Sequence, residues 1–219
     1  MKKVSKDQMA RIDEKVPEKY GITISRMMEN AGCQIADFVR SEINPEGVAV
    51  YAWKGKNGGD ELAAARRLHL WGYDVEVVLA SRELDGIRRE ELEILKELDV
   101  EISTESAENN YSVALEGLIG YKLKSDPRPP FSLTEEVNWY ETIVSIDLPT
   151  GVDADTVERT SPAVEADYTV TLAMPKKRMK RKNLGGIWVA DVSIPPEPYE
   201  ECRFKDIIFR DTSLARLED

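Results

Sequence analysis

The sequence predicts an α/β fold in which helices cover both faces of a mostly parallel central sheet. Short runs rich in β-branched residues alternate with amphipathic helical patterns along the chain, which is the order that parallel sheets require. The 219 residues, 42% hydrophobic and 32% charged, can bury a substantial core. Because no linker divides the chain, we expect one domain over residues 1–219.

Two helices are expected at the N-terminal end. Ser5 and Gln8 have the spacing of a capping box and open a helix that Pro17 is expected to end. A second helix from about Ser25 has an apolar face, and the methionines at 27 and 28 are interpreted as packing residues of the core or of an interface.

Strands and helices then alternate. Strands are expected at residues 48–52, 74–79, 100–102, 111–115, 142–146, 168–172 and 187–192. Helices are expected at residues 61–71, 87–98 and 133–139. In such sheets, ligands bind beyond the carboxyl ends of the strands, so the polar residues there are the candidates for a site.

Composition excludes several classes of protein. A net charge of −11 argues against general nucleic-acid binding. No run approaches the eighteen or so apolar residues of a membrane span, and charges follow Met1 where a signal peptide would be apolar, so a cytoplasmic protein is expected. Cys33, Cys202 and the single histidine, His69, are too isolated for a disulfide framework or a zinc site.

The turn at residues 55–60, GKNGGD, follows the first strand. Glycines at a helix N-terminus expose backbone N–H groups that can bind phosphate, although the turn could also be only a tight connection. It matches neither a Rossmann fingerprint nor a Walker loop.

Four polar residues follow other strands or belong to this turn. Asn57, Glu116 and Thr150 supply hard oxygen donors suited to an alkali or alkaline-earth cation. Asp147 is a carboxylate at the mouth of the sheet, a common place for an acid/base group. Each has a structural alternative, since Asp147 could form a turn, Glu116 could be a solvated strand end and Thr150 a cap.

Six ordered motifs make the chain resemble the NAD(P)H-hydrate epimerase family, also known as the YjeF N-terminal domain. They are MMENAG (27–32), GKNGGDELAAARRL (55–68), EGLIGYKLKSDPRPP (116–130), SIDLPTGVDADT (145–156), ADYTVTLAMPK (166–176) and GGIWVADVSIP (185–195). The resemblance implies a three-layer α/β/α Rossmann-like domain without an accompanying dehydratase domain. It also implies a homodimer that binds K⁺.

The resemblance also implies roles for individual residues. Substrate binding is implied for Lys56, Asn57, Gly58, Gly59, Asp60, Gly120, Tyr121, Lys122, Leu123, Lys124, Ser125, Asp126 and Asp147. Potassium binding is implied for Asn57, Glu116 and Thr150. Three residues depart from the family pattern: Lys56 replaces an asparagine, Glu61 a glycine and Glu116 an aspartate. The longer side chain of Glu116 implies a cation that is shifted, bound through water or lost.

The implied activity interconverts the R and S forms of NAD(P)H hydrated at C6 of the nicotinamide ring, so that a separate dehydratase can repair the S form. Asp147 would be the catalytic acid/base. A binding module without catalysis remains the alternative, whereas a dehydrogenase would need a Rossmann fingerprint. The basic run 176–182 is either a solvated loop or a binder of the dinucleotide phosphates.

Overall fold

The structure is a computed structural model that describes residues 3–120, 131–201, 209 and 211–218. Its strands are β1 (Gly47–Ala52), β2 (Asp74–Leu79), β3 (Glu101–Ser103), β4 (Val113–Glu116), β5 (Thr142–Ile146), β6 (Tyr168–Leu172), β7 (Gly186–Ala190) and β8 (Leu214–Arg216). Its helices are α1 (Lys6–Tyr20), α2 (Ile24–Phe38), α3 (Lys56–Leu70), α4 (Gly86–Glu97), α5 (Phe131–Val137), α6 (Arg181–Leu184) and α7 (Pro196–Glu201). A π-helical turn, η1 (Val39–Ile43), extends α2.

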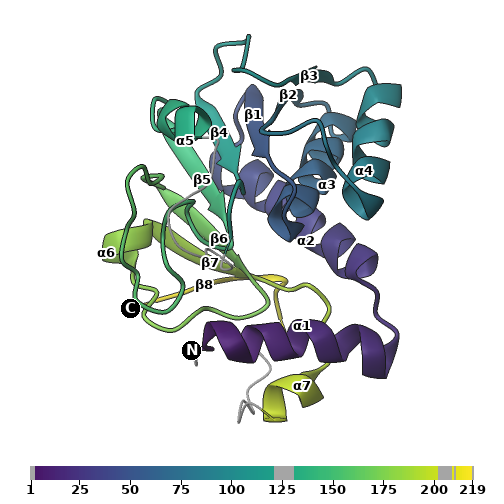
Figure 1. Cartoon of the computed structure of the whole chain (residues 1–219), viewed down its shortest axis with the longest axis vertical. Helices are drawn as coiled ribbons and strands as arrows, with labels where there is room; N and C mark the ends of the chain where they lie inside the picture. Colours follow the sequence, from purple (N-terminus) through teal and green to yellow (C-terminus); the bar gives the residue numbers. More distant parts are fainter. Residues whose placement is uncertain (1–2, 121–130, 202–208, 210, 219) are drawn as a thin grey trace.

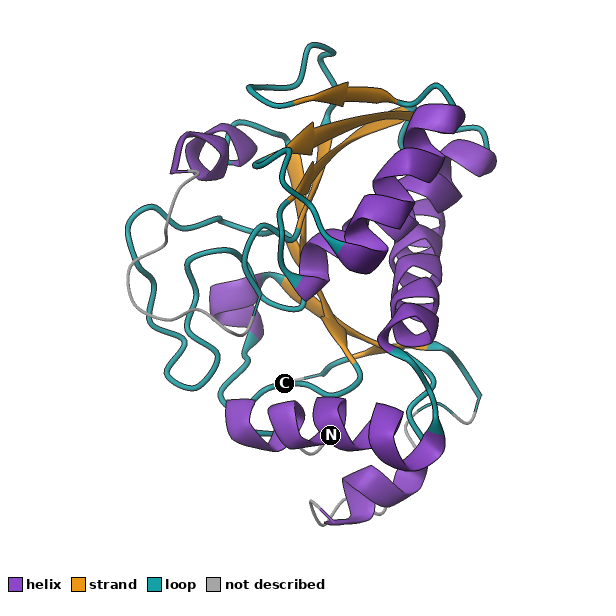
Figure 2. Cartoon of the chain, turned by 45° about the vertical axis from the view of Figure 1, so that its right-hand side comes forward, coloured by secondary structure: helices purple, strands orange, loops and turns teal. Residues whose placement is uncertain are grey.

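The strands form one sheet in the order β3-β2-β1-β4-β5-β6-β7-β8 (Figure 1). Neighbours from β3 to β7 are parallel, and only the β7–β8 pair among the described strands is antiparallel. Helices α2, α3 and α4 cover one face, while α5 and α6 lie on the other (Figure 2). Separate hydrophobic clusters fill the two faces. The predicted α/β class, mostly parallel sheet and three-layer arrangement are therefore confirmed.

Helix α1 does not end at Pro17. It continues to Tyr20, and Gly21 ends it in the left-handed conformation, at φ 65°, with its N–H donating to Pro17 O at 3.1 Å. Buried Val16 lies just before the proline, and the left-handed cap closes the final turn, so the stop signal is the glycine. Helix α1 and α7 lie together at one end of the molecule (Figure 1).

The glycine-rich turn belongs to a helix. Gly55 is the N-cap of α3, and residues 56–60 form its first turns. Because β1 lies beside β4 and β4 beside β5, the start of α3, the end of β4 and the residues after β5 meet at one edge of the sheet. The strand-end rule therefore places the predicted residues near one another.

Candidate active site

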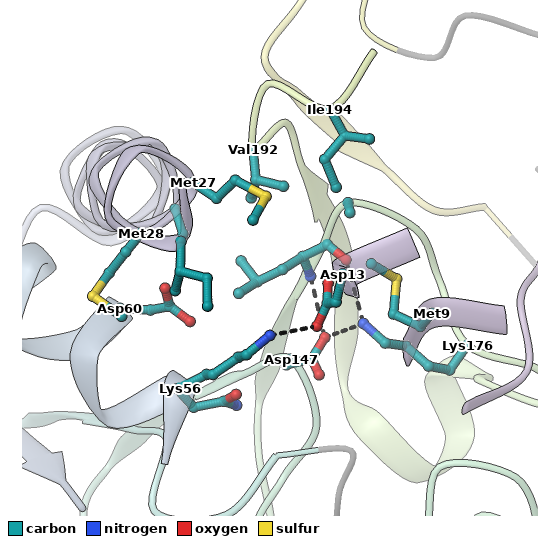
Figure 3. A pocket seen from close by; sticks show the side chains of 15 residues that line it. Met9, Asp13, Met27, Met28, Lys56, Asp60, Asp147, Lys176, Val192 and Ile194 are labelled. Atoms are coloured by element: carbon teal, nitrogen blue, oxygen red, sulfur yellow. Dashed lines mark hydrogen bonds and ion pairs between the residues drawn. The ribbon is translucent and has the colours of Figure 1, made fainter. Parts of the chain in front are cut away.

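A pocket lies at this edge of the sheet (Figure 3). Lys56, Asn57 and Asp60 enter it from α3, Asp147 from the turn after β5 and Lys176 from the turn after β6. Side chains of α1 and α2 complete the wall. Five polar side chains from three distant segments thus face one cavity.

Asp147 forms an ion pair with Lys176, and the two side chains are only 3% and 1% exposed. The carboxylate of Asp147 also accepts from the Thr171 hydroxyl at 3.2 Å and from the backbone N–H of Leu172 at 3.3 Å. The backbone at Asp147 is left-handed, at φ 66°, and its N–H donates to Val170 O at 2.8 Å. These contacts hold the carboxylate of Asp147 in one position beside the ammonium of Lys176.

Lys176 corrects the interpretation of the basic run. The run was expected to be either solvated or free to reach phosphates, but Lys176 is buried in the pocket wall, whereas Lys177 and Arg178 are exposed. The N-terminal segment fixes this loop, because Val4 donates to Pro175 O at 2.9 Å and accepts from the Lys177 N–H at 2.7 Å. Only the exposed part of the run remains available to a phosphate.

Lys56 forms an ion pair with Asp13 of α1 across the pocket (Figure 3). The distance from Lys56 Nζ to Asp13 Oδ2 is 3.0 Å, and the side chains are 36% and 16% exposed. This lysine therefore already has an anionic partner in the absence of any substrate phosphate. Ion pairs at such exposure are weak, typically worth about 1 kcal/mol or less, so a substrate phosphate can compete for the ammonium.

Asp60 is a second buried carboxyl in the pocket, 7% exposed. Burial raises its pKa well above the usual range, and the carboxylates of Asp147 and Asp13 raise the pKa further, while Lys56 and Lys176 lower it by less. The pocket therefore combines an ion-paired carboxylate with a carboxyl that retains its proton at higher pH.

Gly58 and Gly59 allow α3 to pack closely against its neighbours. A Cβ atom at Gly58 would lie 1.7 Å from Trp53 O, and one at Gly59 would lie 2.3 Å from Met28 Cε. Met28 is buried inside the chain, which confirms its interpretation as a core residue. The glycines thus bring the backbone of α3 close to β1 and α2.

Asn57 lies between two of the predicted segments. Its Nδ2 donates to Ile146 O at 3.0 Å, and a Cβ at Gly120 would lie 2.3 Å from the same nitrogen. Lys56 and Asn57 also line a second cavity, together with Leu118, Ile119 and Gly120. The remaining predicted substrate residues, Tyr121, Lys122, Leu123, Lys124, Ser125 and Asp126, lie outside the described part of the chain.

Glu116 and Thr150, two of the three predicted cation ligands, are in direct contact. The Thr150 hydroxyl donates to Glu116 Oε2 at 2.7 Å, and the Thr150 N–H donates to Oε1 at 3.0 Å. Ser145 and the N–H of Leu118 donate to the same carboxylate. Burial raises the pKa of Glu116, and the hydrogen bonds from Ser145 and Thr150 oppose this rise. Glu116 is therefore a buried carboxylate that accepts several hydrogen bonds from the protein, and not a solvated strand end.

Glu61 lies beside this cluster and has no such donors. It is fully buried, and neither carboxylate oxygen has a hydrogen-bond partner. Its carboxyl lies against Gly117, where a Cβ would be 2.7 Å from Glu61 Cδ. Burial raises the pKa of Glu61 well above its usual range, and the charges of Glu116 and Asp60 raise the pKa further.

The donor set fits a hard cation. Within residues 3–120, 131–201, 209 and 211–218, no three His, Cys, Asp or Glu side chains gather as ligands of a metal ion. Two carboxyl groups with amide and hydroxyl oxygens instead suit an alkali or alkaline-earth ion, and the oxygens of Glu61 have no hydrogen-bond partner among the described residues. In the described chain, no helix has the length and apolar character to cross a bilayer.

Three residues of the site were not predicted in these roles. Lys176 was considered only as part of a charge run, although it follows β6 as closely as polar residues follow β5. In the sequence, Glu61 stands out only as a departure from the family motif, and no local pattern predicts its burial. Asp13 carries no sequence signal, because nothing in the sequence places α1 over the pocket.

Comparison with known sequences identifies relatives. A family model described as YjeF-related protein N-terminus matches residues 24–178. The "NAD(P)H-hydrate epimerase" of Cenarchaeum symbiosum is 36% identical over 89% of this chain and 96% of its own length. The protein of the same name from Dehalogenimonas lykanthroporepellens is 32% identical over 94% of this chain and 87% of its own length.

Two further matches concern the length of a relative and the fold of a solved structure. The "Bifunctional NAD(P)H-hydrate repair enzyme Nnr" of Thermofilum pendens is 33% identical over 94% of this chain, and the alignment spans only 43% of that relative. The crystal structure of the yeast protein ynu0 superposes with a TM-score of 0.87, at 26% identity, and covers 99% of this chain and 100% of that one. The match therefore extends through nearly the whole chain.

Proposed function

The chain belongs to the family of YjeF-related protein N-termini, and from this premise we propose that it is an NAD(P)H-hydrate epimerase. The substrates would be the R and S forms of NAD(P)H hydrated at C6 of the nicotinamide ring. The observation that carries the proposal is the juxtaposition of Asp60 with the Asp147–Lys176 pair, because it gives one pocket both a proton donor and a proton acceptor. The second cavity beside Lys56 and Asn57 offers room for the rest of a dinucleotide.

Epimerisation requires the hydroxyl at C6 to leave one face of the ring and water to add to the other. The lone pair of the ring nitrogen expels the hydroxyl, which takes a proton from Asp60 and departs as water. Water then adds to the opposite face of the resulting iminium, and Asp147 accepts its proton. Lys176 stabilises the carboxylate of Asp147 until that step. One water leaves and one water adds, and Asp147 gains the proton that Asp60 loses, so the return of this proton to Asp60 through solvent closes the cycle.

The proposal includes a potassium ion held by Asn57, Glu116 and Thr150. The contact between Glu116 and Thr150, and the orientation of Asn57 toward Gly120 and Ile146, support a shared oxygen site. When bound, the ion would supply positive charge near the phosphates of the dinucleotide. Lys56, Asp60 and the two glycines of the turn would bind the substrate, as would the segment 120–126.

The wider setting of the protein is part of the same proposal. We infer a cytoplasmic homodimer, organised as one domain over residues 1–219, that works with a separate dehydratase. The buried apolar faces of α1 and α2 pack within the chain and so do not themselves require a second subunit. Light scattering at micromolar protein tests the dimer, and a monomer mass would remove it.

The decisive experiment follows the conversion of purified R-form hydrate to the S form by chromatography, with the spontaneous rate subtracted. Asp147→Asn should abolish the added rate while leaving dinucleotide binding within about tenfold, because the amide keeps the shape but cannot exchange the proton. Asp37→Asn, which removes a carboxylate on the outside of α2, is the matched control and should retain the wild-type rate. Binding without any rate above the spontaneous one would establish the alternative, a binding module.

A further inference from the structure

Glu61 is a buried carboxylate whose position no hydrogen bond explains. Both of its oxygens lack partners, although the neighbouring Glu116 accepts from three residues of the protein. A buried carboxylate without a partner costs several kcal/mol by general estimates, so a group that compensates this charge is expected. The epimerase chemistry proposed above uses Asp60 and Asp147 and leaves Glu61 unexplained.

The geometry directs Glu61 toward the oxygen cluster. Asn57 and Glu61 are separated by one helical turn of α3, so they lie on the same face of the helix. Asn57 contacts Gly120 and Glu61 contacts Gly117, which places both against the segment that carries Glu116. Thr150 joins this segment through its hydroxyl, which accepts from the Ile119 N–H at 2.9 Å. Carboxylate, amide and hydroxyl groups from three segments therefore lie along the stretch 116–120.

A proton alone does not satisfy Glu61. Within the described chain, neither oxygen has a hydrogen-bond partner, so a protonated carboxyl would bury an O–H donor without an acceptor. The lysines of the pocket have other partners, because Lys56 pairs with Asp13 and Lys176 with Asp147. A bound cation would compensate the negative charges of Glu61 and Glu116 together.

We propose that Glu61 is a ligand of the cation held by Glu116 and Thr150, and that this second carboxylate makes the site selective for a divalent cation of the calcium type over K⁺. The inference rests on the cation site of the proposed function, and it replaces the potassium ion there with a divalent ion. Two carboxylates carry a charge of −2, which a divalent ion neutralises and a monovalent ion does not. Calcium accepts irregular sets of oxygen ligands, whereas magnesium demands near-octahedral geometry.

The test uses the full chain, stripped of metal with a chelator. Its melting temperature is measured with CaCl₂, MgCl₂, KCl and NaCl at matched ionic strength, and equilibrium dialysis counts the bound calcium. Wild type should bind one calcium ion per chain and melt at a higher temperature in calcium than in potassium. Glu61→Gln, which keeps the size of the side chain, should weaken calcium binding about tenfold or more while changing the response to potassium little.

The matched control is Glu76→Gln, which changes a buried glutamate of β2 that accepts hydrogen bonds from Glu108 and Asn109, away from the pocket. It should keep the calcium response of wild type. A Glu61→Gln variant that binds calcium like wild type would overturn the assignment, as would stabilisation of wild type by potassium but not by calcium. That second result would leave the proposed potassium site standing. No response of wild type to any of the four salts would remove both.

Discussion

Lys176 and Asp147 form an ion pair inside the wall of the pocket, although they lie on turns that follow different strands. Removing one partner of such a pair leaves an unpaired buried charge, which typically costs about 3–5 kcal/mol of the free energy of unfolding. Asp147→Asn and Lys176→Met should therefore each destabilise the protein. The double variant should recover most of the lost stability, because both charges are gone, yet it should remain inactive.

Urea denaturation of the four proteins measures this coupling as a double-mutant cycle. Additive losses in the cycle would show that the two charges do not depend on each other for stability. Recovery of epimerisation in the double variant would exclude Asp147 as the acid/base residue.

Asp13 should act as an internal competitor for Lys56. Because their ion pair is partly exposed, Asp13→Asn should change the free energy of unfolding by about 1 kcal/mol or less. Freeing the ammonium should tighten binding of NADPH by roughly two- to tenfold at low salt, and the gain should fade as salt screens the charges. Calorimetry measures the affinity. Asp7→Asn removes an exposed charge from the same helix, and an equal gain in that variant would refute a specific role of Asp13.

The two glycines of α3 should differ in their tolerance of alanine. In Gly58→Ala the new methyl meets the backbone oxygen of Trp53, which cannot move away, and a loss of about 3 kcal/mol or more is expected. In Gly59→Ala it meets the flexible end of Met28, so a loss of about 1–2 kcal/mol is expected. Met28→Ala should rescue the second variant and not the first. Equal losses, measured by urea denaturation, would contradict this account.

Glu91 should contribute to a decline in stability as the pH rises. Burial raises its pKa above the ordinary value of 4.5, although Arg66 at 2.9 Å lowers it in part. Between that value and the raised pKa, the folded protein binds more protons than the unfolded chain, so the free energy of unfolding falls as pH rises. Glu91→Gln should flatten this decline at pH values above 4.5, where the unfolded chain has lost its proton from Glu91 and the folded protein has not.

The control for this effect is Glu93→Gln, which changes an exposed carboxylate of the same helix, α4. Lys96 lowers the pKa of Glu93, so this carboxyl is already ionised in both states over that range and its removal should leave the slope unchanged. Urea denaturation at a series of pH values measures how the free energy of unfolding of each variant changes with pH. An unchanged slope in Glu91→Gln would mean that its burial does not perturb proton binding.

The sequence predicted the sheet well because its strands are buried on both faces and therefore read as continuous β-branched runs. All six residues of β1 are buried, and β2, β5 and β6 begin and end where the pattern indicated. The start of α3 was missed because glycine disfavours helices, whereas here close packing against β1 and α2 outweighs that preference. The short α6, α7 and β8 have too few residues to show a period.

The strand-end rule gathered Asn57, Glu116, Asp147 and Thr150 correctly at one edge of the sheet. It could not foresee that Lys176 is buried, because a run of basic residues ordinarily favours solvent. Nor could it foresee that Glu61 lacks partners, since hydrogen bonding depends on neighbours from other segments. Such pairings follow from packing and not from local patterns.

The hydrogen bonds between Val4 and the loop that carries Lys176 have a consequence for the biosynthesis of the protein. Lys3 donates to Met179 O and Val4 pairs with Pro175 and Lys177, so residues 3 and 4 leave the ribosome long before their partners are synthesised. The loop that holds Lys176 against Asp147 can close only after β6 and the residues beyond it have emerged. Contacts so distant in sequence form slowly, which makes completion of the pocket a late event in biosynthesis.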